Sequence, residues 1–130
     1  ALHRIRQSCC RQDGFGVVQI VKTRVGIIRC EAQSQNCAGF NCFPAMRNRM
    51  GRFESYEEVE LVGFDTCGGC ERDRTDRIVS RAQRLKDKGA EAIHLASCVI
   101  GACPFEEAFS QAIQQKTGVP VVRGTHPIIG

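Results

Sequence analysis

Short apolar runs alternate along the chain with stretches in which apolar residues recur at helical spacing. The runs cover residues 25–28, 60–64, 92–97 and 119–123. Each is nearly continuous in apolar residues, which is typical of strands that are buried on both faces of a parallel sheet. We therefore expect four short central strands.

Three amphipathic segments separate these runs. Residues 73–88 have apolar positions on one face, acids in the first turn and basic residues in the last, and Gly89 follows as a favoured residue just past a helix end. A second helix is expected between Pro104 and Gly118. A third begins at Pro44, a residue that suits the first helical position. Its expected core-facing residues are Met46, Met50 and Phe53.

Strands that alternate with helices predict β-α-β units with parallel strands and right-handed crossovers. The expected fold is an α/β domain: a small, open, doubly wound sheet of Rossmann or flavodoxin type, with about four strands and helices on both faces. We place this domain at residues 24–126. A basic leader over residues 1–23, disordered or adding an edge strand over 17–21, precedes it, and residues 127–130 form a short tail.

The charge is concentrated in one part of the chain. The net charge is +4, but residues 1–29 contain six basic residues against a single acid, a local charge of +5, so the remainder carries −1. A basic stripe across the folded domain, as a nucleic-acid-binding surface requires, is therefore not expected.

The chain of 130 residues contains nine cysteines. An odd count argues against a closed disulfide framework and favours reduced thiols in a cytoplasmic protein. No apolar run approaches the roughly 20 residues that a membrane span needs.

Seven of these cysteines follow predicted strands. Because the carboxyl ends of parallel strands meet at one edge of a sheet, where ligands bind, these thiols are expected to gather there. Cysteines that served only to fill the core would instead be scattered through it. The candidate metal ligands after the four strands are Cys30, Cys37, Cys42, Cys67, Cys70, Cys98, Cys103 and His126.

The segment Cys67-Gly68-Gly69-Cys70 lies between a strand and a helix. Two thiols separated by two residues can bind one ion or form a disulfide with each other, and glycines allow a tight turn between them. The N–H groups at the start of the following helix would favour thiolate over thiol. The motif by itself is compatible with metal binding and with thiol chemistry.

Five ordered segments carry a resemblance to a known family: Gly26-Ile27-Ile28-Arg29-Cys30, Glu60-Leu61-Val62-Gly63-Phe64, Thr66-Cys67-Gly68-Gly69-Cys70, Ile93-His94-Leu95-Ala96-Ser97-Cys98 and Gly124-Thr125-His126. Together they resemble the CGGC domain family of prokaryotes over residues 24–126. The resemblance implies a metal-binding domain, an assignment that rests on the family's cysteines and histidines, and it implies no established reaction. The loop from Cys37 to Cys42 is similar to a family element that often has proline after its first cysteine, where this chain has Ala38.

Thiolates are soft ligands that suit zinc or an iron–sulfur cluster rather than magnesium or calcium. A zinc site needs four ligands, which Cys30, Cys67, Cys70, Cys98 and His126 could supply. A cluster held by four cysteines leaves spare thiols for redox chemistry or a second centre. Ligand softness does not separate the two, and both stay open.

His94 lies inside the third predicted strand. A core histidine with its ring nitrogens hydrogen-bonded is the expected state there, in preference to a direct metal ligand; a role behind a thiolate ligand is a further option.

Two functions compete. The first is a metal or cluster module for electron transfer, sensing or metal handling, with a redox protein as a possible partner. The alternative is a thiol–disulfide oxidoreductase that uses Cys67 and Cys70, the thioredoxin-like interpretation of a CxxC between strand and helix. The Gly-Gly spacer and the five other nearby cysteines speak against that alternative. A phosphate cradle is not expected, since no G-x-G-x-x-G or P-loop follows a strand.

Overall fold

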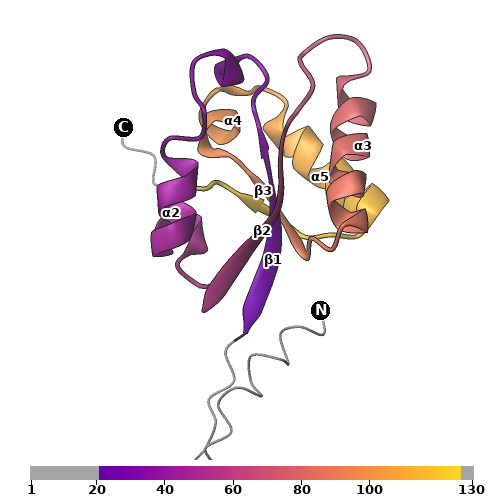
Figure 1. The fold of residues 1–130 in the computed structure, drawn as a ribbon. Helices are drawn as coiled ribbons and strands as arrows, with labels where there is room; N and C mark the ends of the chain where they lie inside the picture. Colours follow the sequence, from indigo (N-terminus) through magenta and orange to yellow (C-terminus); the bar gives the residue numbers. More distant parts are fainter. Residues whose placement is uncertain (1–20, 127–130) are drawn as a thin grey trace, which may run out of the picture.

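A computed structural model describes residues 21–126 of the chain, and in this range the expected parallel sheet is present (Figure 1). Its strands are β1 (Lys22–Arg29), β2 (Glu58–Thr66), β3 (Ala92–Leu95) and β4 (Val121–Arg123). They pair in the order β2-β1-β3-β4, and every pair is parallel. The prediction of a small, doubly wound α/β sheet is confirmed.

Helices cover both faces of the sheet, also as predicted. The helical elements are η1 (Gln33–Gln35), α2 (Cys42–Asn48), η2 (Gly51–Phe53), α3 (Arg74–Asp87), α4 (Ser97–Ala102) and α5 (Glu106–Thr117). In Figure 1, α2 lies on one side of the sheet and α3 and α5 lie on the other.

Side chains of β1 and β3 alternate between these two layers, as the two-residue repeat of a strand requires. Ile28 and Leu95 pack under α3 and α5, whereas Val25 and Ile27 pack against α2 and η2. Each apolar run therefore contributes side chains to two half-cores, one on each face of the sheet. This explains why apolar and polar residues do not alternate along the run.

The helix expected from Pro44 to Phe53 is shorter than predicted. It ends at Asn48 because Arg49 adopts a left-handed conformation (φ 53°), and Phe53 is buried in the separate 3₁₀ turn η2. Met46 packs against the core as expected, but Met50 is 48% exposed, so its predicted core role is wrong.

Two boundaries near the carboxyl edge also differ from the prediction. The third strand ends at Leu95, two residues before its predicted end, and Ser97–Ala102 form α4, a short helix in a segment that is expected to be mostly loop. The second strand is longer than predicted and includes Asp65 and Thr66. The expected edge strand over residues 17–21 falls almost wholly outside the described residues; Val21 lies just before β1.

No helix between residues 21 and 126 combines the length and the apolar character needed to cross a membrane.

Candidate metal centre

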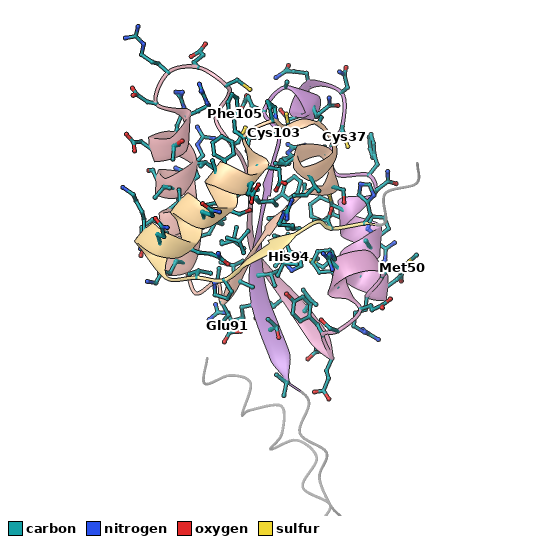
Figure 2. The ribbon with its side chains drawn as sticks, turned by 180° about the vertical axis from the view of Figure 1, so that it is seen from behind. Cys37, Met50, Glu91, His94, Cys103 and Phe105 are labelled. Atoms are coloured by element: carbon teal, nitrogen blue, oxygen red, sulfur yellow. The ribbon has the colours of Figure 1, made fainter. Side chains whose placement is uncertain are left out.

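The seven described cysteines all follow the carboxyl end of a strand along the chain. In Figure 1, α4 and the loop before α3 lie at the same end of the sheet. Cys30 follows β1, Cys67 follows β2, and Cys98 and Cys103 follow β3. Figure 2 shows Cys37 and Cys103 at this end, well away from Glu91 at the amino end of β3. Two cysteines expected in loops are instead in first turns of helices: Cys42 opens α2 and Cys98 is the second residue of α4.

Four of the thiol-bearing residues line one cavity. It has a volume of about 240 Å³, and its cysteines are Cys30, Cys67, Cys70 and Cys103. Its other walls are mainly apolar: Ala32, Gln33, Val99, Ala102, Pro104 and Phe109. Segments after three different strands thus contribute sulfur atoms to one space, which we call the four-thiol cavity.

Backbone amides hold two of these sulfur atoms. The Glu31 N–H donates to Cys67 Sγ (3.4 Å), and the Phe105 N–H donates to Cys103 Sγ (3.4 Å). The Cys67 N–H in turn donates to the Arg29 carbonyl (2.8 Å), which fixes the start of the loop to the end of β1. Amide hydrogen bonds to sulfur stabilise thiolates and tune the centres that thiolates bind.

Cys70 is exposed, on a loop whose two glycines have positive φ values of 90° at Gly68 and 107° at Gly69. These values explain why the spacer is Gly-Gly, since other residues pay a steric cost there. Arg74 anchors the loop: its Nη1 donates to the Cys70 carbonyl (3.3 Å), and its guanidinium lies 3.9 Å from the centre of the Phe105 ring.

The four thiols interact electrostatically. Burial raises the pKa of Cys103, and negative charge on Cys70, Cys67 and Cys30 raises it further, while the Phe105 N–H opposes the rise. Negative charge in the cavity therefore disfavours a thiolate at Cys103 unless a cation compensates it. A bound metal centre would supply that charge.

The other three thiols form a second group outside the four-thiol cavity. Burial raises the pKa of Cys42, whose Sγ lies 3.3 Å from Thr125 Oγ1, and charge on Cys98 and Cys37 raises it further. Cys98 packs against both half-cores and accepts a hydrogen bond from the Cys30 N–H. Cys98 is thus the member of the second group that contacts Cys30 of the first.

Neither described histidine is among the residues that line the four-thiol cavity. His126 is tied to the carboxyl edge by its carbonyl, which accepts from Ser97 Oγ (2.7 Å). His94 lies in the middle of the sheet (Figure 2), fully buried and stacked on Phe53 at 4.4 Å. Both its ring nitrogens have protein partners, Tyr56 Oη (2.8 Å) and the Gly124 carbonyl (2.9 Å), so the expectation of a hydrogen-bonded core histidine is confirmed.

The Cys67–Cys70 pair differs from the thioredoxin-like expectation in two respects. Helix α3 begins only at Arg74, and Asp73 before it is left-handed (φ 66°). The first turn of α3 is thus separated from Cys70 by three residues. Cys67 is also the buried member of the pair and Cys70 the exposed one.

The sequence interpretation missed Thr125 and Ser97. Thr125 is fully buried; its hydroxyl accepts from the Ser97 N–H (3.2 Å) and its own N–H donates to Ser97 Oγ (3.1 Å). These bonds connect the end of β4 to the start of α4, and Cys42 contacts the same hydroxyl. The Gly124-Thr125-His126 segment contains Thr125, but its histidine, as a common metal ligand, is the stronger sequence signal.

The donor set fits a soft metal centre, while the spacing of the thiols does not fit a single ion. In the described range, no three Cys, His, Asp or Glu side chains are grouped closely enough to hold one metal ion. Four cysteines nevertheless surround one cavity. Such spacing is compatible with a larger guest that each sulfur touches at a different point.

The comparisons with known proteins identify the family but no reaction. An uncharacterized protein of the archaeon Methanocaldococcus jannaschii is 36% identical over 116 residues, covering 82% of this chain and 88% of that protein. Among solved structures, an arylmalonate decarboxylase is similar with a TM-score of 0.45 and 21% identity, over 77% of this chain and 42% of that chain, so this chain spans less than half of that enzyme. The model of the CGGC domain matches residues 24–126, and the chain therefore belongs to the CGGC domain family.

Proposed function

We propose that residues 24–126 form a metal-binding unit in which Cys30, Cys67, Cys70 and Cys103 hold an iron–sulfur cluster. The observation that carries the proposal is the single cavity shared by these four cysteines. Iron–sulfur clusters are commonly held by four cysteine thiolates.

Size favours a cluster over zinc. A structural zinc ion lies about 2.3 Å from each of four sulfurs, which leaves no space between them. The four-thiol cavity of about 240 Å³ is instead roughly eight times the 30 Å³ share of one liquid water molecule. A space of this size has room for a polyatomic guest, and among residues 21–126 no three metal-ligating side chains are grouped closely enough to hold a single ion.

The surroundings suit electron transfer. When bound, a cluster supplies a one-electron couple whose potential depends on hydrogen bonds to sulfur and on solvent exposure. The amides of Glu31 and Phe105 provide such hydrogen bonds, and the walls of the cavity include the apolar side chains of Val99 and Phe109. Cys70 lies at the exposed side, where a redox partner protein could approach. The proposed setting is the reducing cytoplasm, which keeps free thiols available.

The test is metal analysis of protein purified without oxygen. We expect iron and sulfide in similar amounts, a broad visible absorbance, and loss of both in Cys67→Ser and Cys103→Ser variants. Cys37→Ser is the matched control, because Cys37 lies at the same end of the sheet but outside the four-thiol cavity, and it should keep the cluster. A colourless, zinc-loaded protein, or equal loss of iron in the control, would contradict the proposal.

A further variant, Cys70→Ser, tests thiol–disulfide exchange at the CxxC. If Cys67 and Cys70 acted as a redox pair, metal-free protein would reduce insulin disulfides and lose this activity in Cys70→Ser. We expect no such activity, because in the described structure the first turn of α3 does not begin until Arg74.

A further inference from the structure

We propose that the outer edge of β2, together with the groove between β2 and α2, is a docking site for an extended acidic segment of a partner protein, which binds as an added strand. The groove has a volume of about 510 Å³, and the residues that line it are Phe43, Met46, Arg47, Arg49, Glu58 and Val59. None of these residues lines the four-thiol cavity, so the proposal does not depend on a metal centre.

Strand β2 is an edge strand of the described sheet. The strand order places it at one end, where only β1 pairs with it in the described range, and all nine of its residues are partly exposed. Backbone N–H and C=O groups that point away from β1 can pair with a further strand. Val62 is the extra residue of a bulge opposite Val25 and Gly26. Because a bulge interrupts regular pairing, the regular stretch beside the groove is Glu58–Leu61.

The groove has two cations that lack a partner. The side chains of Arg47 and Arg49 are exposed and make no hydrogen bond or ion pair with any described residue. Arg49 also has a left-handed backbone (φ 53°) at the end of α2, where glycine is the usual residue. Backbone strain of this kind in a non-glycine residue is concentrated at functional positions. An arginine therefore occupies a position where glycine would be more stable.

The lining defines the chemistry of the occupant. Arg47 and Arg49 against the single acid Glu58 leave a net charge of +1, which one carboxylate neutralises. Guanidinium groups bind carboxylates through paired hydrogen bonds. Phe43 and Met46 offer apolar contact to a neighbouring side chain. Because side chains two positions apart lie on the same face of a strand, the expected segment has an apolar residue and an Asp or Glu separated by one residue.

Charge argues against two other occupants of the edge. An antiparallel second copy of β2 would place Glu58 and Glu60 of the two strands near each other on the same face of the sheet, and like charges across strands are destabilising. Residues 1–20 of the chain contain three basic residues and one acid, so the arginines of the groove repel this segment. The favoured occupant is therefore a segment of another protein.

The experiment selects ligands for the full chain from a displayed library of short random peptides. We expect enriched peptides to have the apolar and acidic residues at the stated spacing. The most enriched peptide is then synthesised, and its binding is measured by fluorescence anisotropy. Arg47→Gln should weaken binding about fivefold, which corresponds to the upper range for an exposed ion pair. Lys116→Gln is the matched control, because Lys116 is exposed on α5 at the other side of the sheet, and it should leave the affinity unchanged.

Arg49→Gly separates binding from folding. Glycine favours the left-handed conformation, so this variant should have a higher melting temperature than the wild type, while its affinity for the peptide falls about fivefold. A residue with a purely structural role would not move these two quantities in opposite directions. Bound peptide should also slow amide hydrogen exchange within Glu58–Leu61, because an added strand accepts hydrogen bonds from the outward N–H groups.

Several results would overturn the proposal. The selection could enrich no acidic peptide, or Arg49→Gly could leave the affinity unchanged. Binding without slower exchange in β2 would mean a site for a small anion only. Dimerisation of the wild-type chain that slows exchange of the same amides would assign the edge to a second copy. The iron and sulfide contents, which test the cluster, affect none of these outcomes.

Discussion

Replacing His94 by glutamine should remove an acid sensitivity that the fold builds into its core. The ring is fully buried, and because the Gly124 carbonyl can only accept, Nδ1 carries the proton and Nε2 accepts from the Tyr56 hydroxyl. Both nitrogens are thus satisfied in the neutral form. Burial lowers the pKa of His94, and the charge of Arg52 adds to the effect, although the bond to Gly124 opposes it.

The sign and size of the effect follow from proton linkage. In the unfolded chain histidine titrates near pH 6.5, so at pH 5.5 it is about nine-tenths protonated. In the folded state His94 has a lower pKa and binds this proton less readily, so the free energy of unfolding falls as the pH drops below 6.5. If His94 stays neutral in the fold, the free energy of unfolding decreases by about 1.4 kcal/mol between pH 7.5 and pH 5.5 from this residue alone.

The assay is urea unfolding at both pH values for the wild type, His94→Gln and Tyr56→Phe. Glutamine offers a donor and an acceptor but does not titrate, so the drop between the two pH values should shrink by about 1.4 kcal/mol in His94→Gln. Tyr56→Phe deprives Nε2 of its partner and should cost roughly 1–3 kcal/mol at pH 7.5 while keeping the acid sensitivity. An undiminished drop in His94→Gln would refute the reasoning.

Three further predictions concern packing, charge and metal loading. Gly26→Ala should destabilise by about 1–3 kcal/mol in thermal unfolding, because the new Cβ would lie 2.8 Å from Leu85 Cδ1 and 3.1 Å from Leu85 Cβ. Gly101→Ala, in α4 with open space around it, is the control and should stabilise by about 0.5–1 kcal/mol. Burial alone would raise the pKa of Asp65, but hydrogen bonds from Arg84 and the next backbone amide bring this pKa below its usual value. The stability that the Asp65 carboxylate provides is therefore present at neutral pH and is lost as the pH falls through the pKa of Asp65 in the folded state. Asp65→Asn should therefore cost roughly 1 kcal/mol at pH 7, and the difference should shrink as the pH falls and the carboxyl of Asp65 takes up a proton. Reconstitution with iron and sulfide should raise the melting temperature of the wild type and not that of Cys67→Ser, because a ligand stabilises only the state that binds it.

Much of the fold could be predicted from local pattern. The runs at 25–28 and 92–95 are apolar on both faces, and the helix ending before Gly89 has its charges and its left-handed terminal glycine in the expected places. Local pattern failed where the backbone changes direction within an apolar stretch. Arg49, left-handed without being glycine, ends a helix that the periodicity continues, and α4 forms in a segment that is expected to be loop after the third strand.

The order of strands and helices determined, without any structure, that the cysteines after successive strands would lie at one edge, since parallel threading sends every carboxyl end the same way. Which thiols share a cavity was decided only by tertiary packing. Cys30 and Cys103 are far apart in sequence and line one space, whereas Cys42, turned into the other half-core by α2, contacts Thr125 instead. The spacing of cysteines along the chain does not say toward which side of the sheet a loop folds, because the direction of the loop depends on the helices that pack against the loop.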